Sequence, residues 1–253
     1  MAVNAITVAD AESAEDSSGT GLTLLRALRR PWTMAGAILT LLFCVVAIIG
    51  PYIAPYDPSA VSNATLAAPS AAHWLGTTQT GQDVLSQLLY GTRTSMVVGA
   101  GAAIIATLLA IVVGLVSGYL GGLADELLSL LANVFLVLPS LPLAVILAAY
   151  LPHTGSAGII GVISITAWAW GARILRAQTL SLRKRDFVEA ARATGERTSV
   201  IILRDILPNQ VAVIAALFLG TVTTAILTQA SLAFLGLTDV TQWSWGTILY
   251  WAQ

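Results

Sequence analysis

The chain has 253 residues, of which 57% are hydrophobic and 10% are charged, and its formal net charge is -1. Soluble domains carry about 25% charged residues, so a soluble fold could not bury this much apolar surface. The balanced charge excludes a global field that would recruit nucleic acid. The single cysteine, Cys44, allows no intrachain disulfide. Neither His73 nor His153 has Cys, Asp or Glu around it at metal-ligand spacing, so no metal site is predicted.

Five apolar stretches are long enough to cross a bilayer as helices. A hydrocarbon core about 30 Å thick requires about 20 apolar residues in helical form, because every backbone polar group must be satisfied within the segment. No stretch contains Asp, Glu, Lys, Arg or His. Residues 1–30 are predicted to be a disordered acidic cytoplasmic tail, residues 1–20, followed by a basic segment. The predicted spans are 32–54, 94–119, 127–151, 156–172 and 211–237.

The distribution of Lys and Arg predicts the orientation of these spans. Three arginines precede the first span, eight basic residues lie between Arg173 and Arg204, and Arg93 is the remaining one. The positive-inside rule places both clusters in the cytoplasm, and the even number of spans between them allows this. The N-terminus is then cytoplasmic, the loop 55–93 is extracytoplasmic, and the loop 173–209 is cytoplasmic.

The cytoplasmic loop contains the pattern of a capped helix. Asp186 is a suitable N-cap, Glu189 follows at the capping-box position, and Gly195 supplies a left-handed residue after the last turn. Thr198 or Ser199 is suited to cap a second helix that continues toward the last span. The loop is therefore predicted to form a helix-turn-helix on the membrane surface.

The run Glu189-Ala190-Ala191-x-x-x-Gly195, with Leu207-Pro208 farther along, resembles the EAA loop of binding-protein-dependent ABC import permeases. In that family the loop forms a coupling helix that seats in a cleft of the cytoplasmic ATPase and passes its ATP-driven closure to the spans. The alternative is a basic amphipathic loop held at lipid headgroups. The residues that the resemblance assigns to coupling are Glu189, Ala190, Ala191, Arg192, Gly195, Arg197 and Pro208.

The outer loop carries a second resemblance, in the runs His73-Trp74-Leu75-Gly76-Thr77 and Gly81-Gln82-Asp83-Val84. It is similar to the segment before the second span in the second, C-type permease subunit of dipeptide, oligopeptide and nickel importers. The chain departs from the family pattern at Thr78, Gln82 and Gln87, where charged residues are usual. This loop is expected to be a structural lid or a contact for a docked binding protein.

The C-terminal segment 238–253 departs from the same family. Its members usually follow a Ser-Trp-Gly run, here residues 244–246, with one more span, whereas this chain stops at Gln253. We expect a sixth span that is absent from this sequence, and a short re-entrant segment is the alternative. The expected fold is an all-α integral membrane protein, a bundle of five to six transmembrane helices of the type I ABC importer permease kind, with a cytoplasmic coupling helix.

The spans lack the ionisable residue that a proton-driven carrier usually needs. Pro139 and Pro142 predict a kink in the third span. The spacing of Gly114, Gly118 and Gly122 predicts close approach of another helix. Polar groups expected to face the bundle interior or a partner are Asn133, Thr166, Thr224, Gln229 and Ser231. The candidate translocation path comprises Asn133, Pro139, Pro142, Gln229 and Ser231.

The resemblance implies a noncatalytic permease subunit of an ATP-driven importer for di- or oligopeptides or similar small solutes, in a bacterial cell membrane. No catalytic residue is predicted, and the chain lacks the phosphate loop that would bind ATP. No cofactor is expected in this chain, because partner ATPases bind ATP and magnesium. The expected partners are a homologous permease subunit, two cytoplasmic ATPase subunits, an extracytoplasmic solute-binding protein and membrane lipid, without nucleic acid. The competing hypotheses are a secondary ion-coupled transporter, a nickel-class ABC permease, and a membrane scaffold or intramembrane enzyme.

Overall fold

The computed structural model describes residues 31–151 and 155–252. The tail predicted for residues 1–30, and His153, lie outside this part of the chain. Within it the regular structure is helical, which confirms the predicted all-α architecture, and one isolated bridge joins Thr77 to Asp83. The elements are α3 (Pro31–Ile53), α4 (Val84–Leu120), α5 (Gly122–Val137), α6 (Ser140–Ala149), α7 (Ser156–Leu182), α8 (Asp186–Ala193), α9 (Thr198–Val200), a π-helical turn (Ile201–Ile206), a 3-10 turn (Pro208–Gln210), α10 (Val211–Phe234) and α11 (Trp245–Trp251).

Four of the described helical stretches are long and apolar enough to cross a membrane. They are α3, α4, α7 and the run Thr198–Phe234, which extends from α9 through α10. Helices α5 and α6 pass the same test as a pair, but they are bent by 87° where they meet. The described part of the chain therefore has four or five candidate spans. The predicted count of five to six stays a prediction.

The bend between α5 and α6 is caused by proline. Leu138 is extended, with φ -74° and ψ 126°, because a residue that precedes proline is disfavoured in the helical region. Pro139 is the N-cap of α6, and Pro142 lies in the first turn of α6, where its missing N–H breaks no helical hydrogen bond. The predicted kink is confirmed, and it divides one apolar run into two short helices.

Two glycines bring α4 and α7 into close contact. A Cβ added at Gly114 would lie 2.8 Å from the carbonyl oxygen of Ala172, and one added at Gly118 would lie 2.6 Å from the Cβ of Thr179. The predicted close approach is confirmed at these positions. Gly122 differs, since it begins α5 with a φ of +55° and has open space beside it in the described chain. It serves the turn between α4 and α5.

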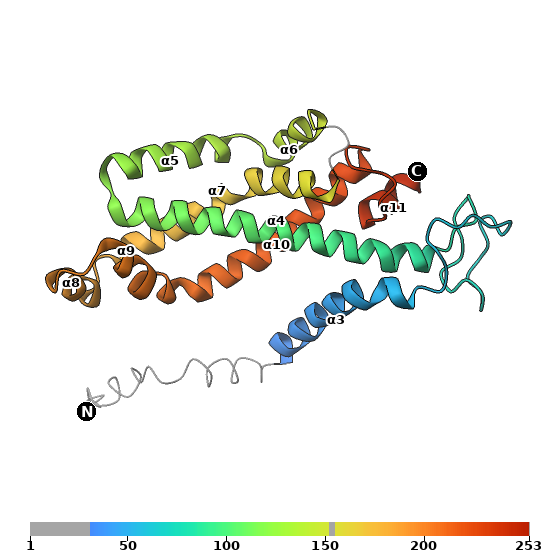
Figure 1. Ribbon diagram of the computed structural model, residues 1–253, viewed down its shortest axis with the longest axis horizontal. Helices are drawn as coiled ribbons and strands as arrows, with labels where there is room; N and C mark the ends of the chain where they lie inside the picture. Colours follow the sequence, from blue (N-terminus) through green and yellow to red (C-terminus); the bar gives the residue numbers. More distant parts are fainter. Residues whose placement is uncertain (1–30, 152–154, 253) are drawn as a thin grey trace, which may run out of the picture. The chain divides into compact units, whose positions relative to one another are not determined.

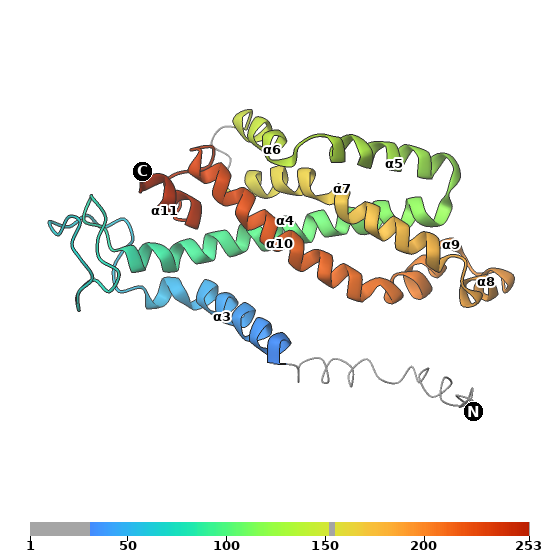
Figure 2. The same ribbon diagram turned by 180° about the vertical axis from the view of Figure 1, so that it is seen from behind.

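The chain divides into two compact units at Val45 and Val46, within α3. The first contributes the described start of α3, residues 31–45. The second contains everything that follows, and in it α7 packs against α4, α5, α6 and α10. Figures 1 and 2 show from opposite sides that α7 lies between α5 and α10.

The two loops singled out in the sequence lie at opposite ends of α4. Helix α8 is at one end, whereas the loop 54–83 and α11 are at the other (Figure 1). Helix α4 has 37 residues, so its ends are about 55 Å apart at 1.5 Å per residue. This separation exceeds the thickness of a bilayer core.

Candidate functional site

The first candidate site is the segment 183–210, which we call the hairpin. Its first helix, α8, follows Arg185, whose extended backbone accepts hydrogen bonds from Val188 N at 2.9 Å and Glu189 N at 3.1 Å. The predicted N-cap at Asp186 and the predicted capping box are wrong. The backbone hydrogen bonds of α8 start at the carbonyl of Arg185, and no side chain caps the helix. Asp186 and Glu189 stay in the first turn, where the helix dipole favours negative charge.

Gly195 ends the first helix of the hairpin. Its φ is +79°, which confirms the predicted left-handed conformation. Glu196 N donates to Ala191 O at 3.1 Å and Gly195 N donates to Arg192 O at 3.0 Å, so the last carbonyls of the helix are satisfied. A Cβ at Gly195 would meet nothing within 4 Å in the described chain. The position therefore requires glycine for its backbone conformation, not for space.

Helix α8 has an anchored face and a free face. Val188 is fully buried and belongs to the same apolar cluster as Ile201 and Ile206. Glu189 and Ala190, the next two residues, are exposed. Successive helical residues point about 100° apart, so these neighbours lie on different faces of α8. The buried valine holds the helix in place, and the exposed pair stays accessible to a partner.

Two arginines join the hairpin to the last turn of α4. Arg192 Nε donates to Tyr119 Oη at 3.1 Å, and its guanidinium carbon lies 4.9 Å from the centre of the Tyr119 ring. Arg183 Nη1 donates at 3.0 Å to the carbonyl of Gly118. The positive charge of these arginines near the C-terminus of α4 also interacts favourably with the negative end of the helix dipole. The hairpin is thus attached to α4 by hydrogen bonds and by charge.

The second half of the hairpin is irregular. It begins with α9, whose N-cap is the exposed residue Arg197. No side chain caps α9, so the predicted caps at Thr198 and Ser199 are wrong. After three α-helical residues the chain continues as the π-helical turn and then as the 3-10 turn. Pro208, which is exposed, is the first residue of the 3-10 turn.

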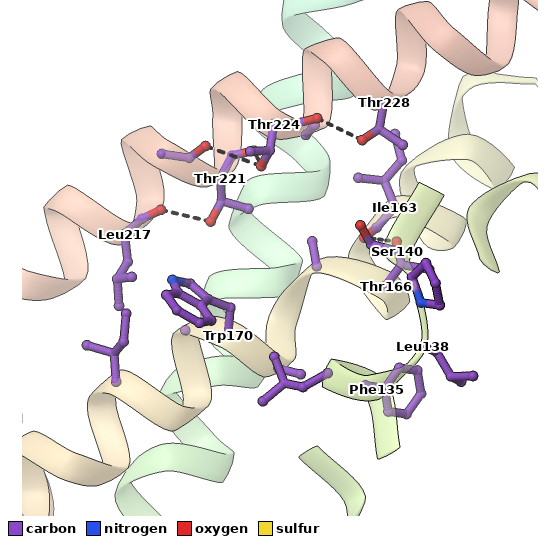
Figure 3. A pocket seen from close by; sticks show the side chains of 18 of the residues that line it. Phe135, Leu138, Ser140, Ile163, Thr166, Trp170, Leu217, Thr221, Thr224 and Thr228 are labelled. Carbon is purple, nitrogen blue, oxygen red and sulfur yellow. Dashed lines mark hydrogen bonds between the residues drawn. The ribbon is translucent and has the colours of Figure 1, made fainter. Parts of the chain in front are cut away.

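The second candidate site is a groove of about 740 Å³ lined by residues of α5, α6, α7 and α10 (Figure 3). Among the described residues that line it none is charged. Its aromatic residues are Phe135 and Trp170. Its hydroxyl residues are Ser140, Thr166, Thr221, Thr224 and Thr228. The wall is therefore apolar with a few hydroxyl groups.

The threonines of α10 present hydrogen-bond acceptors. Thr221, Thr224 and Thr228 project from α10 toward the α7 residues Thr166 and Trp170 (Figure 3). Each hydroxyl donates to a carbonyl one turn earlier in α10, at 2.8 to 3.2 Å. Since each hydroxyl hydrogen is used, the remaining lone pairs of these oxygens can accept hydrogen bonds from a solute.

The groove contains one of the five predicted path residues, Pro139. Asn133 lies in a separate pocket of about 240 Å³ formed by α4, α5 and α7. Gln229 is buried and lines a smaller pocket near α11, and neither Pro142 nor Ser231 lines the groove. Apart from Thr166 and Thr224, sequence reasoning did not single out the hydroxyl residues. The regular spacing of the α10 threonines was the signal that could have revealed them.

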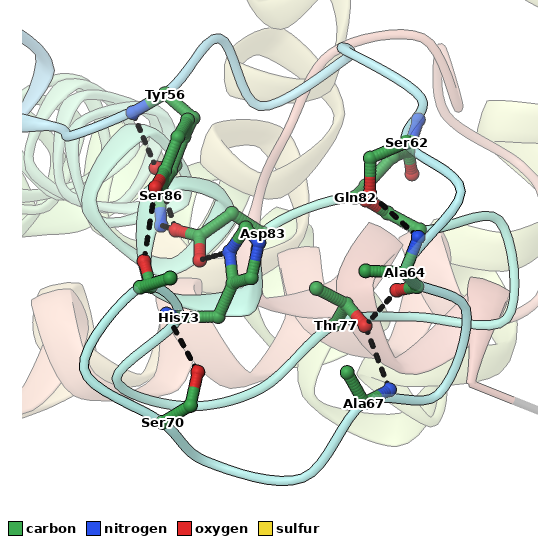
Figure 4. Close-up of polar contacts among 12 residues, drawn as sticks. Tyr56, Ser62, Ala64, Ala67, Ser70, His73, Thr77, Gln82, Asp83 and Ser86 are labelled. Atoms are coloured by element: carbon green, nitrogen blue, oxygen red, sulfur yellow. Dashed lines mark hydrogen bonds and ion pairs between the residues drawn. The ribbon is translucent and has the colours of Figure 1, made fainter.

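Polar contacts organise the outer loop (Figure 4). Asp83 is buried and caps α4 by accepting from Ser86 N at 2.9 Å and from Ser86 Oγ at 2.7 Å, while His73 Nδ1 lies 2.9 Å from its other oxygen. Burial acts to raise the pKa of Asp83, but the hydrogen bonds from His73 and Ser86 outweigh burial and hold that pKa below its usual value. The ionised carboxylate thus joins the loop to the start of α4.

The three departures from the family pattern in this loop contact one another. Gln82 N donates to Thr78 Oγ1 at 3.2 Å, and Gln87 Nε2 donates to Gln82 Oε1 at 2.9 Å. Hydrogen bonds between uncharged side chains therefore connect the positions at which the resemblance led us to expect charged residues.

Helix α11 lies against α4 and α10, at the end of α4 that carries the loop 54–83 (Figure 1). Ser244 and Thr247 form its capping box. Trp245 donates from its backbone N to Ser95 Oγ and from Nε1 to Thr92 Oγ1, both at 3.1 Å. The segment 238–253 thus contains a short helix that packs on the bundle.

Comparison with known proteins shows that two parts of the chain match known protein families. Residues 110–250 match the family described as binding-protein-dependent transport system inner membrane component. Residues 20–69 match the N-terminal TM domain of oligopeptide transport permease C. The first match covers the groove and the whole hairpin.

Curated relatives are similar over most of the chain. The oligopeptide transport system permease protein OppC of Bacillus subtilis is 35% identical, over 95% of this chain and 81% of its own length. The dipeptide transport system permease protein DppC of the same organism is 37% identical, over 81% of this chain and 64% of its own length. The glutathione transport system permease protein GsiD of Pectobacterium atrosepticum is 32% identical, over 84% of this chain and 71% of its own length.

Proposed function

Because the chain belongs to the family of inner membrane components of binding-protein-dependent transport systems, we propose that it forms half of the translocation path of an ATP-driven importer for di- or oligopeptides. The relatives carry oligopeptide, dipeptide and glutathione transport in their names, and these solutes share the peptide group. The chain is then a multi-pass membrane protein of the bacterial inner membrane, with a cytoplasmic N-terminus.

The observation that carries this proposal is the accessible face of α8. Glu189 and Ala190 are exposed, while Val188 anchors the helix in the core. A helix that is fixed on one side and free on the other can receive a displacement from a partner and pass it to the bundle. We assign this role to the hairpin, with a cytoplasmic ATPase as the partner, and Ala191, Arg192, Gly195, Arg197 and Pro208 complete the coupling segment. A homologous permease would bring a second hairpin, so the complex would contain two ATPase subunits.

The groove is suited to carry a peptide. Its apolar wall tolerates varied side chains, and the threonine oxygens can accept hydrogen bonds from peptide N–H groups. The absence of charge among its described lining residues avoids strong trapping of a charged terminus, which would slow release. The homologous permease subunit would cover the open side of the groove and supply the second half of the path.

The remaining partners follow from the two ends of the molecule. The loop 54–83 lies opposite the hairpin, where an extracytoplasmic solute-binding protein would deliver the peptide (Figure 1). ATP and magnesium would be bound by the ATPase subunits, and this chain would be a noncatalytic component.

Substitutions at two glycines, one of them a control, test the coupling role of the hairpin. In the importer reconstituted with its ATPase, partner permease and binding protein, Gly195→Val should abolish peptide-stimulated ATP hydrolysis, because valine is strained at a φ of +79°. Gly161→Ala is the matched control, since a Cβ there also meets nothing within 4 Å in the described chain and the residue is helical. Normal stimulation in Gly195→Val, with the complex intact, would overturn the proposal.

A further inference from the structure

Within the hairpin, the helical run that leads from α9 into α10 is interrupted at residues 201–210, which we call the interrupted segment. A π-helical turn covers Ile201–Ile206 and a 3-10 turn covers Pro208–Gln210. Pro208 has no N–H, so it cannot donate to the carbonyl one turn earlier. Asn209 Nδ2 donates at 2.6 Å to the carbonyl of Asp205, where a side chain replaces the regular backbone donor. Such π-helical turns are rare and occur frequently at functional sites.

Gln210, the last residue of the interrupted segment, reaches across to α7. Its side chain is 1% exposed, and its Nε2 donates to Thr179 Oγ1 at 2.8 Å. Thr179 is also fully buried, and its hydroxyl donates at 2.8 Å to the carbonyl of Leu175. Two consecutive buried hydrogen bonds therefore join the interrupted segment to the backbone of α7.

Thr179 is held in turn by α4. It occupies the contact at Gly118, where an added Cβ would lie 2.6 Å from its own Cβ. Thr179 therefore cannot move without disturbing the contact between α7 and α4. Gln210 is thus hydrogen-bonded to Thr179, the residue at which α7 packs closely against Gly118 of α4.

The side chain of Gln210 is also incompletely satisfied. Its Oε1 is buried and has no hydrogen-bond partner among the described residues. A buried amide oxygen without a partner is costly and is rarely retained without a reason. An apolar residue of similar size would avoid this cost, so packing alone does not explain a glutamine here.

From these contacts we propose that Gln210 is a positioning residue, whose hydrogen bond to Thr179 holds the interrupted segment in register with α7. A displacement of α8 is then passed to α7 and α4 instead of being absorbed where the helix is irregular. This inference rests on the coupling function proposed for the hairpin and adds the point at which the displacement enters the bundle.

The test keeps the shape of the buried side chains. Thr179→Val removes both hydrogen bonds of the hydroxyl, to Gln210 and to Leu175, whereas Gln210→Leu removes only the one between the two side chains. In the reconstituted importer, Thr179→Val replaces a hydroxyl by a methyl group, and Thr179→Ser retains the hydroxyl. Thr179→Val should raise the ATP hydrolysed per peptide transported about three- to tenfold, the range that corresponds to the one buried hydrogen bond between α7 and Gln210. Thr179→Ser should keep the wild-type ratio. Gln210→Leu should raise the ratio as Thr179→Val does, and the double variant should be no worse than the worse single one.

The outcomes separate this inference from the function on which it rests. If the wild-type chain shows no ATP-driven peptide uptake, the proposed function fails. If uptake is ATP-driven but both Thr179→Val and Gln210→Leu keep the wild-type ratio, or lose hydrolysis and transport in equal proportion, the positioning role is wrong. Equal losses would mark a merely structural hydrogen bond.

Discussion

Arg192 of α8 donates a hydrogen bond to the hydroxyl of Tyr119 at the end of α4, and its guanidinium group also lies near the ring of that tyrosine. The two residues are 73 positions apart in the chain. The contact joins α8, to which we assign the contact with the ATPase, to the 37-residue helix α4. It therefore gives a physical route by which a movement of α8 reaches α4.

Tyr119→Phe should weaken this route without removing it. The ring remains, while the acceptor for Arg192 Nε is lost, so the attachment of α8 should weaken by about 0.5–1.5 kcal/mol. We expect a partial loss of peptide-stimulated ATP hydrolysis in the reconstituted importer. Lys184→Gln provides a control on the same exposed, basic part of the hairpin. If Lys184→Gln has the larger effect, net charge and not this contact controls coupling.

Gly118→Val should destabilise the bundle itself. The added Cβ would lie 2.6 Å from the Cβ of Thr179 and 2.9 Å from the carbonyl oxygen of Arg176, and a backbone atom cannot move aside as a flexible side chain can. Overpacking of this kind costs about 1–3 kcal/mol. Thermal unfolding of the detergent-purified chain should show a lower midpoint for this variant than for Gly161→Ala. Equal midpoints would mean that α4 and α7 are not closely packed in solution.

Asp83 predicts a pH dependence of the outer loop. Its pKa is lower in the folded chain than in the unfolded one, so the ionised carboxylate contributes stability above the unfolded value of about 3.8. That contribution should be lost as the pH falls from this value through the lower folded pKa. Protease protection of the loop, measured from neutral pH into this acidic range, should fall for the wild type. Asp83→Asn should be less protected at neutral pH and should change less in the acidic range, and an unchanged profile in this variant would assign the pH effect to another group.

The threonines of the groove should affect transport and not hydrolysis. Thr224→Val keeps the shape and removes an acceptor, so the KM for peptide uptake should rise about two- to fivefold, as expected for the loss of one hydrogen bond. Basal ATP hydrolysis should stay unchanged. Thr223→Val is the matched control, because Thr223 is exposed on the same helix and does not line the groove. Equal effects of the two variants would place the path elsewhere.

Hydropathy located the apolar core of each long helix but not its ends. The apolar run of α4 begins near residue 94, whereas the helix begins at Val84, because Asp83 caps its first turn and Thr92 accepts a hydrogen bond from Trp245 of α11. Helix α7 continues to Leu182, past the last apolar stretch, because its Arg176 pairs with Asp125 and Arg183, the residue after the helix, donates to the carbonyl of Gly118. The break at Pro139 was predictable, since proline acts locally.

The hairpin and the groove differ in how far sequence could predict them. The glycine at position 195 and the helix before it follow from local backbone preferences, although the caps were assigned to the wrong residues. The groove depends on three segments distant in sequence, and only tertiary packing brings Thr228 and Trp170 to the same groove. The hydrogen bond between Gln210 and Thr179 was not predictable for the same reason.

The most direct measurement of the central claim is the accessibility of α8. With the single native cysteine replaced in Cys44→Ser, Ala190→Cys provides one thiol on the exposed face of that helix. We predict that a membrane-impermeant thiol reagent labels it only from the cytoplasmic side of oriented vesicles, and that assembly with the ATPase protects it. Labelling from the outside, or labelling that the ATPase leaves unchanged, would contradict the account.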